Sequence, residues 1–119
     1  EAIDALGATA TFRLVHDTFH HHLAGGGPIF ADRTGIVHIS GVTDPSLSVA
    51  EMGDRDRVLV DAADRLGNLD QIAALQAAGY AGPVSFECFA PQVHAAADPL
   101  RALAQSIDFV RQGLAARAA

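Results

Sequence analysis

The feature that most constrains the fold is the alternation, along the chain, of short strand-like segments with segments of helical character. Three segments are rich in β-branched and aromatic residues: 11–16 (TFRLVH), 35–42 (GIVHISGV) and 83–89 (PVSFECF). In the first of these, Phe12, Leu14 and Val15 suit a buried, pleated surface. Helical segments lie before, between and after the three segments, and strands that alternate with helices are typical of a parallel α/β sheet. Because a sheet of three strands has two open edges, we expect the chain to be part of a larger α/β domain.

Two helices are marked by the residues at their starts. A helix over 68–80 begins with Asn68, a good N-cap, and Gln71 three positions later completes a capping-box pattern. Asp98 and Pro99 predict the start of a final helix, as its N-cap and its first helical residue. The apolar stripe expected on that helix consists of Leu100, Leu103, Ile107, Val110 and Leu114.

The remaining segments predict shorter elements. Residues 1–6 have the pattern of a helix that stops at Gly7, and residues 18–23 that of a single helical turn. Residues 43–67 predict no long element. The alanine-rich tail after Gly113 is expected to fray from the final helix.

Composition limits the classes of function. The 119 residues suffice for one domain, and half of them are hydrophobic, so a core can form. No apolar run approaches the roughly 18 residues of a membrane span, and the first residues do not resemble a signal peptide. The net charge of −6 argues against nucleic acids and anionic membranes as partners. The single cysteine, Cys88, excludes an internal disulfide, favours a reducing, cytoplasmic compartment, and is expected to be a small buried residue.

Each predicted strand carries one metal-competent residue toward its carboxyl end, namely Asp17, His38 and Glu87. Active sites of parallel α/β proteins gather at that end of the strands. Acidic and imidazole side chains on apolar strands are costly to bury unless they are paired or bind a metal. Two carboxylates and one imidazole form a fairly hard ligand set, suited to Mn²⁺, Mg²⁺, Co²⁺ or Zn²⁺.

Ordinary structural roles explain the same three residues about equally well from the pattern alone. A single histidine in a strand, such as His38, is more often a hydrogen-bonded core residue than a ligand. Asp17 has the position of a cap for the turn that follows it. Glu87 has a possible ion-pair partner in an arginine such as Arg57.

Further polar residues near these positions are candidates for contact with a substrate. His20 lies three residues after Asp17, so a helical turn would direct both toward one cavity, where the imidazole can bond a substrate hydroxyl. Arg57, in the segment DRDRV, has a loop position from which an arginine reaches a substrate oxygen, whereas Arg55 is equally well explained as a solvated charge. The histidines expected to be structural are His16, His21 and His22.

Several segments, in this order, resemble the C-terminal part of sugar-isomerase-like (xylose-isomerase-like) TIM barrels: DTFHHH, VHISGV, DRDRV, ALQAAGYAGPVSFECF and the closing helix. The resemblance extends from Phe12 to Val110. It is strongest to the inosose (2-keto-myo-inositol) isomerases of inositol catabolism, followed by the ketose 3-epimerases. It implies an α/β fold in which residues 1–119 form the C-terminal part of a (β/α)8 barrel, about strands six to eight with their helices.

The resemblance also implies roles for individual residues. Such barrels hold a divalent metal with Glu, Asp, His and Glu from the last four strands, and Asp17, His38 and Glu87 match the last three of these ligands. His20 matches a substrate-contacting histidine in a D-x-x-H motif, and Arg57 matches an arginine that contacts the substrate. The first Glu ligand would belong to a preceding strand that these residues do not include.

The activity that the resemblance implies is isomerisation or epimerisation of a sugar or inosose through an enediolate, with Glu87 and the first Glu moving the proton. Relatives often have a Pro-Gly-x-Gly turn where this chain has LVDAAD (59–64), which leaves the substrate undetermined. Two alternatives are a metal-dependent phosphodiesterase related to the apurinic-site endonucleases and a fragment that binds metal weakly or not at all. For the 119 residues in isolation we expect an inactive fragment.

Overall fold

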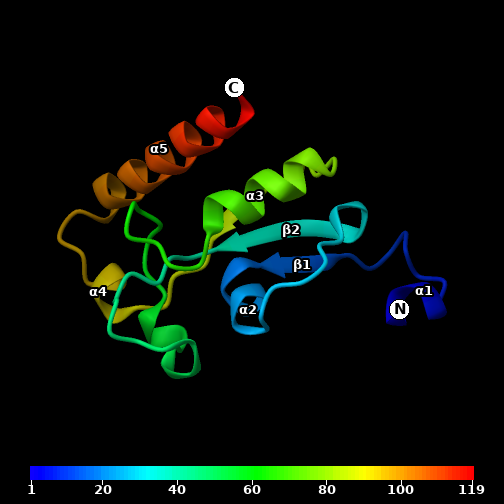
Figure 1. Ribbon diagram of the computed structural model, residues 1–119, viewed down its shortest axis with the longest axis horizontal. Coiled ribbons are helices and arrows are strands. Elements are labelled where there is room, and N and C mark those ends of the chain that lie inside the picture. Colours follow the sequence, from blue (N-terminus) through cyan, green and yellow to red (C-terminus); the bar gives the residue numbers. More distant parts are fainter.

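The computed structural model describes all residues from 1 to 119, with overall dimensions of 46 × 34 × 22 Å. Helices and strands alternate as expected from the sequence (Figure 1). In chain order they are α1 (Ala2–Ala5), β1 (Leu14–Asp17), α2 (Thr18–Leu23), β2 (Thr34–Ile39), α3 (Asn68–Ala77), β3 (Val84–Phe86), α4 (Pro91–His94) and α5 (Pro99–Ala118). Short 3-10 turns lie at Ala31–Arg33, Val49–Glu51 and Asp54–Asp56. None of the helices combines the length and apolar character that crossing a bilayer requires.

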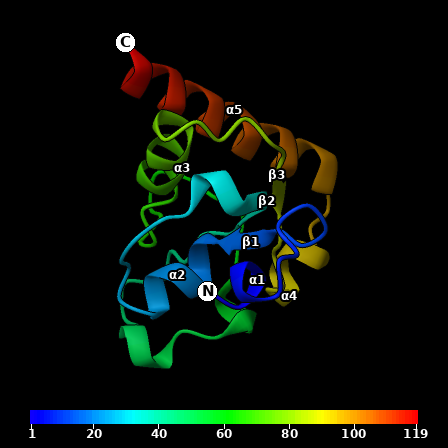
Figure 2. The ribbon, with the colours of Figure 1, turned by 90° about the vertical axis from the view of Figure 1, so that its right-hand side faces the viewer.

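The three strands form one parallel sheet in the order β1-β2-β3, which confirms the predicted α/β class. Helices α3 and α5 lie side by side on one face of this sheet (Figures 1 and 2). The segments that follow the strands, including α2, α4 and the turns within 43–67, gather at the carboxyl ends of the strands (Figure 1). The architecture therefore brings the ends of all three strands and their following segments into one region.

Two apolar clusters hold these layers together. The larger cluster joins the sheet to α3 and α5 and contains Val37, Ile39, Val60, Ile72, Leu75, Tyr80 and Val110. The smaller cluster packs the 43–67 segment against α2 and contains Phe19, Val42, Met52 and Leu66. The irregular 43–67 segment, which the sequence correctly predicted to lack a long element, is thus fixed by burial of its own apolar side chains.

Both edges of the sheet are open, as expected for three strands. Phe12, just before β1, is 56% exposed, and Val15, within β1, is 55% exposed. The sequence predicted a buried strand there. Val84 on β3 is likewise exposed. The expectation of burial was wrong for Phe12 and Val15. Val15 alternates with His16, whose side chain reaches α3, so Val15 lies on the face of the sheet turned away from α3 and α5, and β1 has a neighbouring strand on one side only.

The start of α3 differs from the predicted capping box. Gly67, with a φ of +68°, is the N-cap, and Asn68 is the first helical residue. The Asn68 side chain is fully buried and donates to the carbonyl of Ser40 and the carboxylate of Asp64 instead of capping the helix. Gln71 donates to backbone carbonyls rather than accepting from the N-cap amide. The same residue pattern therefore serves a tertiary connection, not a local one.

Helix α5 begins with Asp98 as the predicted N-cap, whose carboxylate accepts a hydrogen bond from the amide of Arg101. Two expectations for this helix were wrong. Leu100 is 79% exposed because it lies in the first turn, beyond the region that packs on the sheet. The tail does not fray, since Arg117 pairs with Asp70 at 2.8 Å and ties the last turn to α3.

Candidate metal centre

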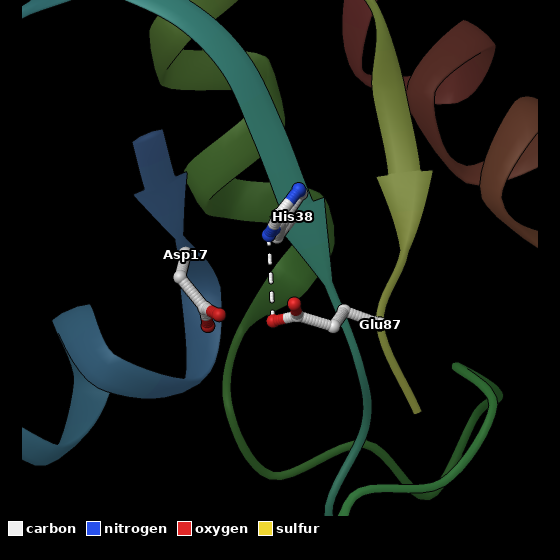
Figure 3. A group of neighbouring side chains, drawn as sticks. All are labelled: Asp17, His38 and Glu87. Atoms are coloured by element: carbon white, nitrogen blue, oxygen red, sulfur yellow. Dashed lines mark ion pairs between the residues drawn. The ribbon is translucent and has the colours of Figure 1, made fainter. Parts of the chain in front are cut away.

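Asp17, His38 and Glu87 converge at the carboxyl ends of the three strands (Figure 3). Asp17 is the last residue of β1 and is the direct cross-strand partner of His38 on β2. Glu87 follows β3, and its amide continues the parallel ladder by donating to the carbonyl of Ile39 at 2.8 Å. Since side chains alternate along a strand, this register directs all three side chains to the same face. The alternation of side chains along each strand, read from the sequence, therefore predicted correctly that the three residues share one face.

The spacing and chemistry of the three side chains fit a divalent cation. One ligand atom from each lies within 4.8 Å of the others. Two ligands at about 2.1 Å from one ion are at most about 4.2 Å apart, so binding requires only a small contraction of the group. The side chains of His38 and Glu87 are 26% and 33% exposed, so an ion can reach them from solvent.

Asp17 has two roles at once. Its Oδ1 accepts hydrogen bonds from the amides of Phe19 (2.9 Å) and His20 (3.3 Å), so it caps α2 as the structural interpretation of the sequence proposed. Its Oδ2 accepts from Nη2 of Arg57 at 2.8 Å. Burial acts to raise the pKa of Asp17, but the hydrogen bonds and charge of Arg57, with the amide of His20, outweigh it and lower the pKa below its usual value. The carboxylate is therefore ionised and oriented.

Glu87 contacts both His38 and Arg57. Its Oε2 lies 3.3 Å from Nδ1 of His38 and 3.2 Å from Nη2 of Arg57. The pairing of Glu87 with Arg57, the structural alternative raised from the sequence, is thus present. It coexists with the convergence that a metal site needs, so the two interpretations are not exclusive.

Arg57 is one of the most buried residues in the molecule, with 1% of its surface exposed. Besides both carboxylates, it donates from Nε to Ser40 Oγ at 2.9 Å and from Nη1 to Asp54 at 3.3 Å. The guanidinium carbon lies 4.7 Å from the ring centre of Phe19 and 5.1 Å from that of Phe89. The predicted contact of Arg57 with a substrate stays a prediction, because in this structure its contacts are with protein groups.

Sequence reasoning missed the residues that surround Arg57. Ser40 has the same strand parity as His38, and Phe89 the same parity as Glu87, so each was available as a neighbour two positions farther along. Neither residue type signals chemistry by itself. Only the position of the arginine side chain, which comes from an irregular segment, reveals their function.

The histidines within residues 16–22 lie outside the group of three converging residues. His16 points away from the metal group and bonds Gln71 of α3 at 2.9 Å, with its ring 4.7 Å from that of His21. Burial lowers the pKa of His21, and the charges of His16 and His22 lower it further. His20 is exposed on α2, with its ring against that of Phe19 and its amide on Asp17. It is not one of the three converging residues, and its contact with a substrate stays a prediction.

Cys88 lies on the other side of the strand from Glu87, beside a large cavity. This cavity, of about 670 Å³, is lined mainly by apolar side chains between β3, α4 and α5. The Cys88 thiol contacts the carbonyl of Val58 at 3.2 Å, and burial raises its pKa to about 11. A thiol of this kind is protonated at neutral pH, but Cys88 is only partly buried, whereas the sequence predicted a buried residue.

Known proteins with a similar sequence or structure share this architecture. A family model described as xylose isomerase-like TIM barrel matches residues 1–113. No curated protein sequence matches the chain. Among solved structures, a xylose isomerase domain-containing protein from Salmonella typhimurium LT2 superposes with a TM-score of 0.81 and 28% identity over 91% of the chain. The IolI protein, solved with a bound zinc atom, superposes with a TM-score of 0.69 and 22% identity over 86% of the chain.

A third similar structure is a fusion of a xylose isomerase-like TIM barrel with a 4-hydroxyphenylpyruvate dioxygenase. It has a TM-score of 0.58 and 26% identity over 88% of the chain. In all three cases the chain spans less than half of the other protein, namely 42% of the Salmonella protein, 37% of IolI and 18% of the fusion protein.

Proposed function

Because the chain belongs to the xylose isomerase-like TIM-barrel family, we propose that it contributes to a divalent-metal-dependent isomerase or epimerase of a sugar or inosose. The observation that carries this proposal is the convergence of Asp17, His38 and Glu87 from three adjacent parallel strands. Their donor set suits Mn²⁺, Mg²⁺, Co²⁺ or Zn²⁺. The zinc atom bound by IolI supports a divalent ion without deciding the element.

The residues present divide the chemistry among them. A divalent cation held by Asp17, His38 and Glu87 would supply positive charge to the oxygens of an enediolate. Glu87, partly exposed and oriented by His38 and Arg57, is the carboxylate that we assign to proton transfer, as base and then as acid. We assign to the exposed imidazole of His20 a hydrogen bond with a substrate hydroxyl.

Arg57 belongs to the proposed substrate site and donates hydrogen bonds to both of its carboxylates. Its hydrogen bonds to Ser40, Asp54, Asp17 and Glu87 engage four N–H groups of a guanidinium that has five. A direct contact with a substrate oxygen would therefore use the remaining N–H group. The substrate itself is a small sugar or polyol ketone rather than nucleic acid or lipid, in keeping with the net charge of −6.

This activity is proposed for the protein expressed from its full reading frame, and the isolated 119 residues are predicted to be inactive. We also propose that the reaction takes place in the cytoplasm, because the single cysteine is a free thiol. Inositol catabolism is the proposed setting if an inosose is the substrate.

The test is Glu87→Gln in that protein, assayed on a panel of ketoses and inososes with added Mn²⁺ or Zn²⁺. Turnover should fall by at least about a hundredfold while the fold is retained, because a carboxylate that moves the proton is lost. Asp108→Asn, an exposed carboxylate on α5, is the matched control and should leave turnover unchanged. Unchanged turnover in Glu87→Gln would sink the proposed role. Cleavage of abasic DNA without turnover of any sugar would favour the phosphodiesterase alternative.

A further inference from the structure

The environment of Arg57 is unusual for a residue expected to touch a substrate. Its Nη2 lies between the two carboxylates of the candidate metal centre, 2.8 Å from Asp17 Oδ2 and 3.2 Å from Glu87 Oε2. It is therefore a buried cation at the point where a divalent cation would also be attracted. One positive charge faces two negative charges, which leaves a net charge of −1 for the three groups.

The position of this guanidinium is fixed by groups that are not metal ligands. Ser40 accepts from Nε, and Asp54 accepts from Nη1. The guanidinium carbon also lies over the rings of Phe19 and Phe89, whose π-faces favour a cation. Because these contacts engage the edges of the guanidinium away from Asp17 and Glu87, the charge remains in place when the two carboxylates bind something else.

A fixed cation has opposite effects on the empty and the metal-loaded site. In the empty site it offsets the repulsion between Asp17 and Glu87 and keeps their oxygens directed toward one point. In the loaded site it repels the metal and shares its ligands. Coulombic repulsion over a few ångströms in a partly buried site outweighs the modest gain from orienting two side chains. The net effect on metal affinity is therefore a reduction.

We propose that Arg57 is a built-in counter-ion of the metal centre, a positioning residue that holds Asp17 and Glu87 together before metal binds and competes with the metal for them. The competition rests on the proposed metal-dependent function. Its consequence is an exchangeable metal whose affinity is set below what three such ligands would otherwise provide.

The first test compares Mn²⁺ affinities by calorimetry in the protein expressed from its full reading frame. Arg57→Met removes the charge with little change in length and should tighten Mn²⁺ binding at least tenfold. Arg57→Lys retains the charge but not the forked geometry, so its Mn²⁺ binding should lie between that of the unsubstituted protein and that of Arg57→Met. Arg55→Met, an exposed arginine of the same turn, is the matched control and should show no change. A merely structural Arg57 would give the opposite result, unchanged or weaker binding in Arg57→Met, and that result would overturn the proposal.

A second test needs no metal. In chelator, Glu87→Gln should lower the urea midpoint of unfolding when Arg57 is present, because a buried cation loses a partner. In the Arg57→Met background the same change should raise the midpoint, since it relieves the repulsion between the two carboxylates. Effects of equal sign and size in both backgrounds would overturn the counter-ion role.

The remaining outcomes distinguish failure of the counter-ion proposal from failure of the proposed function. If Arg57→Met does not fold, Ser40→Ala removes the acceptor of Nε and loosens the guanidinium, so Mn²⁺ binding should tighten by a smaller factor. Unchanged or weaker binding in Ser40→Ala would then overturn the proposal. If the unsubstituted protein binds none of the divalent ions, the proposed function fails together with the competition. If it binds Mn²⁺ but Arg57→Met does not bind it more tightly, the counter-ion proposal alone fails.

Discussion

The two ends of strand β1 differ in how completely other parts of this chain cover and hydrogen-bond their residues. At the carboxyl end, Asp17 is 10% exposed in its side chain and both of its oxygens accept hydrogen bonds. Two residues earlier, Val15 is 55% exposed on an edge with no neighbouring strand. The candidate site is thus specified by contacts within these 119 residues, whereas the sheet on which it is built is not closed by them.

The contacts that position the site therefore differ from the contacts that would close the sheet. The site depends on three strand ends, on the Asp54–Arg57 turn and on the buried side chain of Asn68 behind them. The open edges affect the burial of apolar surface and hence stability and association. Substitutions at the site end should therefore destabilise the chain through lost hydrogen bonds, and substitutions at the edge should act mainly on association.

The largest effect is expected for Asn68→Ala at the site end. Asn68 accepts from Thr18 Oγ1 at 2.6 Å and donates to the Ser40 carbonyl at 2.8 Å and to Asp64 at 2.9 Å. Its removal leaves the Ser40 carbonyl, just after β2, and the Thr18 hydroxyl of α2 without this partner, which should lower the free energy of unfolding by about 2–3 kcal/mol. Urea unfolding followed by circular dichroism measures this loss. Gln76→Ala, exposed on the same helix, should change stability by less than about 0.5 kcal/mol, and an equal loss there would remove the distinction.

A smaller loss is expected for Asp17→Asn. The amide side chain can still cap α2, but it no longer supplies a charge to Arg57, so we expect a loss of about 1–2 kcal/mol. The same urea experiment gives the value, with Asp108→Asn as the exposed control. A neutral or stabilising result would mean that Glu87 alone suffices as the partner of Arg57.

At the open edge, Val15→Lys tests the other side of the comparison. Because Val15 is exposed, the 119-residue chain should change in stability by less than about 0.5 kcal/mol, and a charge on an edge strand should reduce self-association. Sedimentation velocity at several concentrations measures the association. A loss well above 1 kcal/mol would show that another copy of the chain covers this edge in solution. The same substitution in the protein from the full reading frame should be costly if a further strand covers it there.

The comparison also explains which features the sequence could predict. Asp17, His38 and Glu87 were found because strand parity and parallel pairing are local regularities that position side chains without knowledge of the rest of the fold. The pairing of Arg57 with Glu87 was raised as an alternative, but its simultaneous contact with Asp17 was not found. Arg57 follows the 3-10 turn Asp54–Asp56, which has no periodicity to indicate where its side chain points. The expected burial of Val15 failed for a different reason, since burial depends on what covers the face and the edge of a strand rather than on the strand itself.

Contacts between distant residues account for the errors in the helices. Asn68 and Gln71 have the pattern of a capping box, yet their side chains bond the Ser40 carbonyl just after β2, a carbonyl of α2 and one in the preceding loop. The last turn of α5 is held by Arg117 and Asp70, which lie 47 positions apart. A local pattern cannot distinguish a side chain that caps its own helix from one that reaches another element.

The smallest predicted effect on stability concerns the β3 edge, which is open like that of β1 but is held at its start by Tyr80. The Tyr80 hydroxyl donates to the carbonyl of Pro83 at 2.6 Å, and the same carbonyl accepts from the amide of Val37 on β2. Burial raises the pKa of Tyr80 above its ordinary value of 10.0. A raised pKa in the folded state means that the contribution to stability is present at lower pH and is lost as the pH rises above about 10.

Because Tyr80 is the single tyrosine and the chain has no tryptophan, tyrosinate absorbance at 295 nm reports this group alone. The midpoint should lie above that of the same chain in urea, where the phenol has its unperturbed pKa near about 10. Gly82→Ala should bring the two midpoints together, since a Cβ there would lie 2.6 Å from the Tyr80 hydroxyl oxygen and force the ring to move. Equal midpoints in the unsubstituted protein would mean that the start of β3 is as open as the β1 edge.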